Sequence, residues 1–239
     1  MKAVILAAGD GGRLGEHTTR TPKPLVQLNG RPLISYTLDA LRDAGVSSAT
    51  IVLGYKADQV QTRLRHDPHG LRLSYALNPR YYGGASISLR AARQHVEGEP
   101  FLLVMSDHVL SPGIISALLD AHRDGGPSLL AVDSSAWPDD YVDEATRVAF
   151  DPESRLITRI GKQITAWDAL DTGAFLMQPD IWDAVAAAPP DCELSPICSV
   201  LLERGRFAAV DATGHPWYDI DTGDDLHAAG ERLTLGGGR

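Results

Sequence analysis

The chain has 239 residues, a formal net charge of −9 and 44% hydrophobic residues. This length and apolar content suit one large α/β domain, and no second domain is required. The negative charge disfavours nonspecific binding to nucleic acid or to an anionic membrane, so we expect small-molecule partners. With only two cysteines, no signal-like opening segment and no stretch near the roughly 20 apolar residues of a membrane helix, a reduced cytoplasmic protein is predicted. The sequence gives no indication of the oligomeric state.

Apolar strands alternate with amphipathic helices through the first half of the chain. Strands are predicted at 2–6, 50–53, 71–77 and 101–105, and helices at 33–44, 57–64 and 85–96. A helix at 112–121 and a strand at 128–132 continue the series. Such alternation is typical of a mainly parallel sheet with helices on both faces.

The order of elements changes in the second half. A hairpin is expected from 147–150 and 156–160, and a short strand at 174–177. Helices near 195–202 and 224–233 flank a strand at 207–210, and residues 236–239 are expected to fray. We therefore predict a single domain over 1–239 with a three-layer, Rossmann-like α/β fold and a mixed, mainly parallel sheet.

The most informative segment follows the first predicted strand. Four glycines lie there, at positions 9, 11, 12 and 15. Their N–H groups can approach an anion without interference from a Cβ atom, and Arg13 and Lys23 supply nearby positive charge. A dinucleotide fingerprint is excluded because its third glycine would fall on Leu14. A Walker loop is excluded because Pro22 and Pro24 enclose Lys23 and preclude a helix start of the Walker kind. An anion-binding loop with two cations remains.

Two acidic segments are candidates for a metal site. Asp107 follows the strand expected at 101–105, at the edge where open parallel sheets bind ligands, although an aspartate there can also cap the next helix. His108 beside it either contacts a ligand or is structural. Near the C-terminus, Asp219 and Asp221 would project to the same side of an extended segment, and one of them should complete the metal site.

Two further groups receive structural interpretations. Asp224 and Asp225 begin a helical pattern, where acidic residues interact favourably with the helix dipole, so we expect them to cap that helix. Cys192 and Cys198 have no His or Cys at zinc-finger spacing around them, so helix packing is their expected role.

Three segments near the N-terminus together carry a family resemblance. They are Leu6-Ala-Ala-Gly-x-Gly-x-Arg-Leu14, Pro22-Lys-Pro-Leu25 and Leu28-x-Gly-Arg-Pro-Leu-Ile34. This pattern resembles the signature of nucleotidyltransferases that activate sugar phosphates and related small phosphates. The resemblance implies a Mg²⁺-dependent enzyme that releases pyrophosphate, with residues 1–110 mainly binding the nucleotide and residues 111–239 mainly binding the acceptor.

The resemblance also implies roles for individual residues. Arg13 and Lys23 would be catalytic. The metal ligands would be Asp107 with Asp219, and Asp221 would be a close neighbour or an alternate ligand. The nucleotide-binding residues would be Leu6, Ala7, Ala8, Gly9, Gly11, Gly12, Arg13, Lys23, Gly84, Ala85, Ser86 and Asp107.

A narrower resemblance extends over nearly the whole chain. Its segments are Val142-Asp-Glu-Ala-Thr-Arg-Val148, Ile160-Gly-Lys162, Asp171-Thr-Gly-Ala-Phe-Leu176, Glu193-Leu-Ser195 and Trp217-x-Asp-Ile-Asp-Thr222. They are similar to CTP:inositol-1-phosphate cytidylyltransferases and to related phosphonate cytidylyltransferase domains. This implies CTP as the nucleotide and a small phosphate or phosphonate, such as inositol 1-phosphate, as the acceptor. The acceptor-binding residues would be Lys162, Asp171, Thr172 and Gly173.

The sequence departs from that narrower pattern at two places. Residues 83–89 replace an asparagine-containing stretch, and Arg147 stands where lysine is usual. Two alternatives therefore stay open. One is a guanylyl-, uridylyl- or thymidylyltransferase that acts on a sugar 1-phosphate, and the other is a catalytically silent nucleotide sensor.

Overall fold

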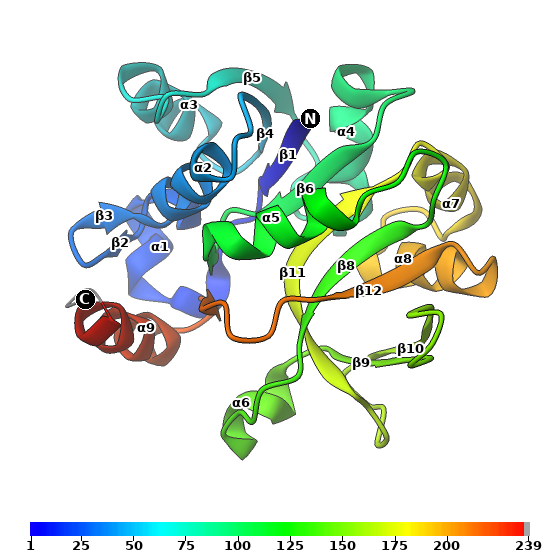
Figure 1. Ribbon diagram of the computed structural model, residues 1–239. Helices are drawn as coiled ribbons and strands as arrows, with labels where there is room; N and C mark the ends of the chain where they lie inside the picture. Colours follow the sequence, from blue (N-terminus) through cyan, green and yellow to red (C-terminus); the bar gives the residue numbers. More distant parts are fainter. Residues whose placement is uncertain (237–239) are drawn as a thin grey trace.

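The strand β1 (Lys2–Ala7) lies inside a nine-stranded sheet in the computed structural model of the protein, which describes residues 1–236 (Figure 1). It pairs in parallel with β4 (Ser48–Leu53) on one side and with β6 (Phe101–Met105) on the other. The strand β5 (Arg72–Leu77) pairs in parallel with β4 and ends the sheet on that side. Strands β1 and β6 are almost continuously apolar because both of their faces are covered.

The sheet becomes mixed and forks at β11 (Ala169–Met177), which runs antiparallel to β6. One branch contains β8 (Ser128–Asp133), with β12 (Phe207–Asp211) parallel beside it. The other branch is the antiparallel hairpin of β9 (Arg147–Phe150) and β10 (Ile157–Gly161). The predicted mixed, mainly parallel α/β sheet is confirmed.

Helices cover both faces of this sheet. One face carries α2 (Leu33–Asp43), α3 (Ala57–His66) and α5 (Pro112–Ala121), and the other carries α4 (Ala85–Val96), α7 (Ile181–Ala187) and α8 (Leu194–Glu203). The side chains of β1 alternate accordingly, with Ala3 and Ile5 in the first core cluster and Val4 and Leu6 in the second. Among residues 1–236, no helix is long and apolar enough to cross a membrane.

Short elements gather at the carboxyl edge of β1 and β6. They are the 3₁₀ turns η1 (Gly12–Leu14) and η2 (Lys23–Leu25), the helices α1 (Glu16–Arg20), α6 (Asp139–Glu144) and α9 (Gly223–Gly236), and the strand pairs β2 (Gln27–Leu28) with β3 (Arg31–Pro32) and β7 (His108–Leu110) with β13 (Trp217–Asp219). A separate small apolar cluster holds several of them together, with Leu14, Val109, Ile220 and Ala229 among its members. This cluster joins the first 30 residues of the chain to its C-terminal helix.

The structure differs from the predicted elements mainly in β11 and in the short strands. Strand β11 begins at Ala169 rather than at 174, because Ala169 and Leu170 also pair with β9. Its register with β8 shifts between Asp171 and Phe175, where Gly173 has φ +75°. Asp171, Thr172 and Gly173 therefore lie inside a long strand. The strands β7 and β13 were not predicted. Of the tail expected at 236–239, residues 237–239 lie outside the residues that the structure describes.

Candidate active site

The chain reverses its direction of travel across the sheet next to β1. It moves from β1 outward to β4 and β5 and then returns to β6 on the opposite side of β1. Open α/β sheets bind ligands at the carboxyl ends of strands that flank such a reversal. The glycine loop follows β1 at this edge, and Asp107 follows β6.

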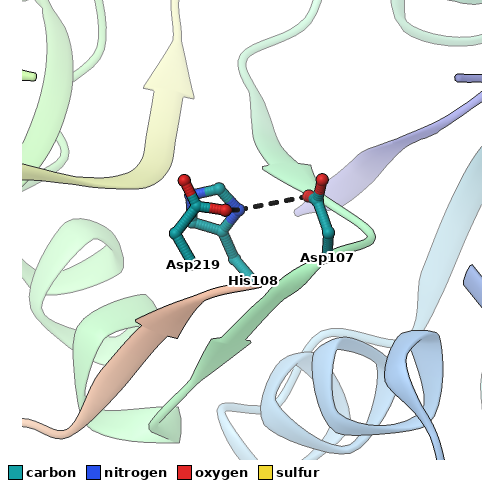
Figure 2. A group of neighbouring side chains, drawn as sticks. All are labelled: Asp107, His108 and Asp219. Atoms are coloured by element: carbon teal, nitrogen blue, oxygen red, sulfur yellow. Dashed lines mark hydrogen bonds and ion pairs between the residues drawn. The ribbon is translucent and has the colours of Figure 1, made fainter. Parts of the chain in front are cut away.

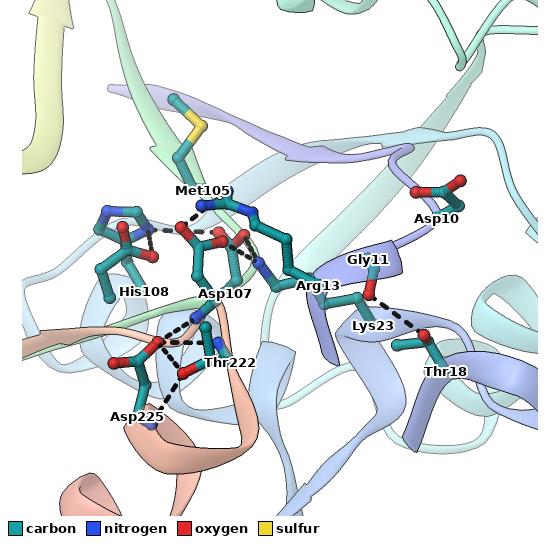
Figure 3. A network of polar contacts seen from close by, with 12 residues as sticks. Asp10, Gly11, Arg13, Thr18, Lys23, Met105, Asp107, His108, Thr222 and Asp225 are labelled. Atoms are coloured by element: carbon teal, nitrogen blue, oxygen red, sulfur yellow. Dashed lines mark hydrogen bonds and ion pairs between the residues drawn. The ribbon is translucent and has the colours of Figure 1, made fainter. Parts of the chain in front are cut away.

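The glycine loop is held open by its own hydrogen bonds. Thr18 Oγ1 donates to the carbonyl oxygen of Gly11 at 3.1 Å or of Gly15 at 3.2 Å, and both glycines have positive φ (Figure 3). A Cβ atom on Gly11 would lie 2.7 Å from Lys23 Cβ, so only glycine allows the loop to approach the lysine this closely. The N–H of Gly12 donates to a carboxylate oxygen of Asp10 at 3.2 Å. This loop already binds an anionic group through its backbone.

Lys23 is the centre of a polar network that joins three distant segments. Its Nζ lies 2.5 Å from Asp107 Oδ2 (Figure 3) and 2.7 Å from Asp221 Oδ1. Arg13 reaches the other oxygen of Asp221 at 2.7 Å. The two predicted catalytic cations and two of the three predicted metal-binding aspartates therefore meet in one place.

Burial and charge act in opposite directions on this network. Burial alone would lower the pKa of Lys23, but Asp107 and Asp221 outweigh it and hold the pKa above its usual range. Burial would likewise raise the pKa of Asp107, but Lys23 and His108 hold it well below its usual range. Lys23 and Asp107 are therefore both charged at neutral pH.

Asp107, His108 and Asp219 form a second group beside Lys23 (Figure 2). His108 and Asp219 are direct cross-strand partners in the β7–β13 pair, and such partners project from the same face. His108 Nδ1 lies 3.2 Å from Asp107 Oδ1 and 3.7 Å from Asp219 Oδ1. One ligand atom from each of the three residues lies within 4.8 Å of the others. Two carboxylates and an imidazole at this spacing fit a divalent cation.

The charges of this group are only partly balanced by the protein. Burial works against a charged imidazole, but Asp219 and Asp107 outweigh it and raise the pKa of His108 to about 9. Burial raises the pKa of Asp219 despite its attraction to His108, and the charges of Asp107 and Asp221 raise it further. A bound cation would relieve this crowding of carboxylates.

Asp107 is fixed by the backbone around it and not by a helix-capping role. The hydroxyl of Thr37 in α2 lies 3.3 Å from the carbonyl oxygen of Met105 and 3.1 Å from that of His108, one on each side of Asp107. The cap of α5 is instead Ser111, whose Oγ accepts from Gly113 N at 3.3 Å. The capping interpretation of Asp107 is therefore excluded.

Asp219 and Asp221 lie in different local structures, because Asp219 is the last residue of β13 and Asp221 lies in the turn before α9. Strand β13 ends at Asp219, and Asp221 turns toward Lys23 and Arg13. Asp225 Oδ2 accepts from Asp221 N at 3.1 Å and from Thr222 N at 2.7 Å, while Thr222 Oγ1 accepts from Asp225 N at 3.2 Å. This reciprocal arrangement is a capping box. The predicted capping role is confirmed for Asp225.

The predicted acceptor residues lie on β11 and at the end of β10. Asp171 Oδ1 accepts from Gly173 N at 2.7 Å, and burial raises the pKa of its carboxyl to about 6 even though Gly173 N–H and His108 favour the ionised form. The Thr172 hydroxyl is buried and donates to Ala131 O at 2.8 Å, so it is used inside the sheet. Lys162 is exposed and forms no ion pair within residues 1–236. The structure thus places Asp171 and Gly173 beside His108 and leaves Lys162 exposed to solvent.

The predicted nucleotide-binding residues 84–86 lie at the N-terminus of α4, under the segment that precedes α8. Ser86 N donates to Cys192 O at 2.9 Å, and a Cβ atom on Gly84 would lie 2.3 Å from the Cys192 carbonyl. The carboxylate of Glu193 lies 3.4 Å from Ala85 N. These three residues, which were predicted to bind the nucleotide, therefore use backbone groups to contact this covering segment.

An aromatic cluster supports β13 and was not found from the sequence. Trp137 stacks on Tyr141 with 4.5 Å between ring centroids, and both rings contact Trp217. The indole N–H groups of Trp137 and Trp217 donate to the same oxygen of Asp133, at 3.0 and 2.9 Å. Thr37 was missed as well. Trp217 and Thr37 have no local signal, because their partners Asp133, Met105 and His108 lie tens of positions away.

The family of this chain follows from comparison with known proteins. Residues 3–201 match the family described as the MobA-like NTP transferase domain, and the chain belongs to that family. Its fold is that of a nucleotidyltransferase domain.

Individual relatives narrow the comparison. The chain is 31% identical to the bifunctional IPC transferase and DIPP synthase of Thermococcus kodakarensis over 97% of its own length and 50% of that protein. It is 32% identical to the CMP-5'-(3-aminopropyl)phosphonate synthase of Streptomyces rubellomurinus, over 98% of this chain and 39% of that one. Sugar-1-phosphate uridylyl- and guanylyltransferases also match, at 26% and 27% identity.

Among solved structures, the inositol-1-phosphate CTP transferase from T. maritima is similar over 98% of this chain and 94% of its own, with a TM-score of 0.83 and 25% identity. The chain spans about half the length of the bifunctional relatives that it matches.

Proposed function

We propose that this chain transfers a cytidylyl group from CTP to the phosphate or phosphonate oxygen of a small acceptor such as inositol 1-phosphate, and releases pyrophosphate. The observation that carries the proposal is the meeting of Lys23 and Arg13 with Asp107 and Asp221 at the carboxyl edge of β1 and β6. A buried lysine and an exposed arginine beside a glycine loop suit a triphosphate chain better than any uncharged ligand.

The reaction needs no nucleophile from the protein. The second pKa of a phosphate monoester is near 6, so the acceptor oxygen is largely ionised at neutral pH. This oxygen forms a bond to the α-phosphorus as the bond from that phosphorus to the bridging oxygen of the β-phosphate breaks. Pyrophosphate leaves with the electron pair. The barrier lies in bringing two anions together and in stabilising the charge of the transition state.

The residues of the chain meet those two demands. Lys23 would contact the α-phosphate and the incoming oxygen, since its ammonium is buried and charged at the junction of the three segments. Arg13 and the N–H groups of residues 9–12 would hold the β- and γ-phosphates, in place of the carboxylates that now neutralise Arg13 and Gly12 N. Substrate phosphates would thus replace Asp10 and Asp221 as partners of these groups.

Asp107 and Asp219 would hold Mg²⁺, which would supply positive charge at the α-phosphate when bound. Asp221 would keep Lys23 and Arg13 oriented in the free enzyme. On the acceptor side, Asp171 and the backbone of Gly173 would contact the acceptor, with Lys162 approaching its phosphate from the exposed end of β10.

Support for CTP comes from the relatives and not from a contact to the base. The matched solved structure is that of an inositol-1-phosphate CTP transferase, and the phosphonate relative is named for a CMP-linked product. A cytoplasmic location stays a prediction.

The proposal is tested by measuring pyrophosphate release with ATP, CTP, GTP and UTP against inositol 1-phosphate, hexose 1-phosphates, phosphocholine and 3-aminopropylphosphonate. CTP should exceed the other nucleotides in kcat/KM by at least about tenfold, or roughly 1.4 kcal/mol. A preference for GTP or UTP with a hexose 1-phosphate would replace the cytidylyltransferase by the sugar-phosphate alternative. Release with no pair of substrates would favour the nucleotide sensor.

A further inference from the structure

We propose that His108 Nδ1 is a third protein ligand, with Asp107 and Asp219, of the divalent cation in this site, and that the site therefore favours Mn²⁺ over Mg²⁺ more strongly than an all-oxygen site would. The inference rests on the proposed function for the presence of a cation. It adds the identity of a nitrogen ligand and its consequence for the choice of metal.

The positions of the three ligand atoms fit one coordination sphere. His108 Nδ1 lies 3.2 Å from Asp107 Oδ1 and 3.7 Å from Asp219 Oδ1, and the set lies within 4.8 Å (Figure 2). An octahedral ion with bonds of about 2.1 Å keeps neighbouring ligand atoms about 3 Å apart. The imidazole therefore lies where a ligand could bind between the two carboxylates, and a bound cation would replace the proton that Nδ1 shares with Asp107.

The two oxygens of Asp107 face different partners. Its Oδ2 lies 2.5 Å from Lys23 Nζ, and its Oδ1 faces His108. Lys23 therefore does not occupy the space between Asp107 Oδ1, His108 and Asp219. A cation can enter that space without displacing the lysine that the proposed reaction needs.

The orientation of the imidazole is set by the backbone of β11. A Cβ atom on Gly173 would lie 2.3 Å from both Cδ2 and Nε2 of His108, so the glycine allows the ring edge to pack directly on the strand. The opposite edge of the ring carries Nδ1 toward the carboxylates. Asp171 accepts a hydrogen bond from Gly173 N, so its carboxylate lies near the edge of the imidazole that faces away from Asp107 and Asp219. Carboxylates are common on that side of histidines that bind a metal.

An imidazole nitrogen changes the metal preference of a carboxylate site. Carboxylate and water ligands suit Mg²⁺ and Mn²⁺ alike, whereas imidazole suits transition metals. Adding His108 to Asp107 and Asp219 should therefore strengthen binding of Mn²⁺, a first-row transition metal, more than binding of Mg²⁺.

The test is pulsed electron paramagnetic resonance of Mn²⁺ bound to the full chain, with and without a non-hydrolysable CTP analogue. The wild-type protein should show coupling of the manganese to a histidine nitrogen. His108→Asn places an amide oxygen near the position of Nδ1, so it should keep bound Mn²⁺ and lose the nitrogen coupling. His108→Ala should weaken Mn²⁺ binding by at least about tenfold and should lower the ratio of Mn²⁺ to Mg²⁺ affinity.

The matched control is His227→Ala. His227 lies on the exposed face of α9 and pairs with a carboxylate, Glu231, at 3.5 Å, so it reports binding of Mn²⁺ to a surface histidine. This variant should keep both the nitrogen coupling and the affinity. Asp107→Asn should abolish Mn²⁺ binding at the site, and it provides the reference spectrum and affinity for a protein without this site.

Two outcomes would overturn the inference in different ways. If Mn²⁺ binds the wild-type protein in an Asp107-dependent manner but shows no nitrogen coupling, His108 is not a ligand, and the proposed transfer reaction is unaffected. If Asp107→Asn leaves Mn²⁺ binding unchanged, the cation site itself is elsewhere, and the metal assignment of the proposed function fails with the inference.

Discussion

Lys23 is the residue on which the proposed chemistry depends most. It is buried between Asp107 and Asp221, so its charge is fixed before substrates arrive. Because a fixed cation near a reacting phosphate stabilises the transition state more than the bound substrate, Lys23→Ala should lower kcat by at least about 100-fold. The measurement is pyrophosphate release at saturating CTP, with circular dichroism to verify folding.

Lys2→Ala is the matched control for Lys23→Ala. It removes another lysine that pairs with a carboxylate, Glu99 at 3.0 Å, on the surface away from the site. This variant should keep wild-type turnover. Near-normal kcat in a folded Lys23→Ala protein would show that the lysine has no role in the reaction.

Asp219 and Asp221 should differ in what their loss changes. Asp219 belongs to the group with Asp107 and His108, whereas Asp221 holds Lys23 and Arg13. We expect Asp219→Asn to lower Mg²⁺-dependent kcat by at least about 100-fold, since an amide keeps the shape but not the charge. Asp221→Asn should cost less. Rates measured across a Mg²⁺ titration decide the matter, and a larger loss at Asp221 would assign it as the main second ligand.

Asp171 should make the stability of the metal-free protein depend on pH. Burial raises the pKa of this carboxyl to about 6 in the folded protein, against about 3.9 in an unfolded chain. The folded state therefore binds the proton more tightly. The stability contributed by the protonated group is fully present below about pH 4 and is lost as pH rises through about 6.

Asp171→Asn mimics the neutral carboxyl and can keep the bond from Gly173 N. Its free energy of unfolding should exceed that of the wild-type protein by about 1–3 kcal/mol at pH 7.5, and the two should converge near pH 4. Denaturant unfolding in the presence of a chelator measures this. Asp133 should show the opposite dependence of stability on pH. Burial would raise its pKa, but hydrogen bonds from Ser135, Trp217 and Trp137 outweigh burial and lower it, so its contribution to stability is lost as pH falls. If the difference in free energy of unfolding between Asp171→Asn and the wild-type protein grew toward acid pH, the expected sign would be wrong.

At the scale of single elements, the start of α9 is what places Asp221. Asp225 accepts from Asp221 N and Thr222 N, and this capping box fixes the turn between β13 and the helix. Asp225→Ala should lower the free energy of unfolding by about 1 kcal/mol and raise the KM for CTP, because Asp221 loses its support.

Asp224→Ala is the control that separates the effect of the capping hydrogen bonds from the effect of charge at the helix dipole. Asp224 lies in the same first turn but is exposed and forms no side-chain hydrogen bond within the described residues. Both variants lose a dipole interaction, so the difference between their unfolding free energies isolates the capping bonds. Equal effects on stability and on KM would show that the box does not position Asp221.

At the scale of the whole molecule, the sequence predicted the long elements better than the short ones. Strands such as β6, expected at 101–105, have a local apolar pattern and turn residues at their ends, and β6 is found at Phe101–Met105. The pair β7–β13 has no such signal. Its strands have three residues each, and Asp219 meets His108 across more than 100 intervening residues.

The same distinction holds for the site, where the residues in local motifs were predicted and their tertiary partners were not. Arg13 and Lys23 stand in local motifs, so their presence in one site with Asp107 was expected, and Lys23 pairs directly with that aspartate. The position of Thr37 behind Asp107 and the divergence of Asp219 from Asp221 depend on tertiary packing, which local patterns do not encode.

The site also joins the ends of the chain, and this should appear in thermal stability. Arg13, Asp107 and Asp221 come from the first, middle and last parts of the sequence, so a nucleotide bound among them should stabilise the fold as a whole. A ligand at 100 times its Kd adds about 2.7 kcal/mol, which for this chain length raises Tm by about 5–10 °C. We expect such a shift with CTP and Mg²⁺, measured by differential scanning calorimetry.

The size of the shift should distinguish nucleotides. One that binds tenfold more weakly than CTP adds about 1.4 kcal/mol less at the same concentration, so its shift should be smaller by about 3–5 °C. Lys23→Ala should reduce the shift with CTP, because the lysine also contacts the phosphates of the bound nucleotide in this proposal, and Lys2→Ala should keep the whole shift. A larger shift with GTP or UTP would favour the sugar-phosphate alternative. The absence of a shift with every nucleotide would contradict the assignment of the glycine loop, Arg13 and Lys23 as a triphosphate site.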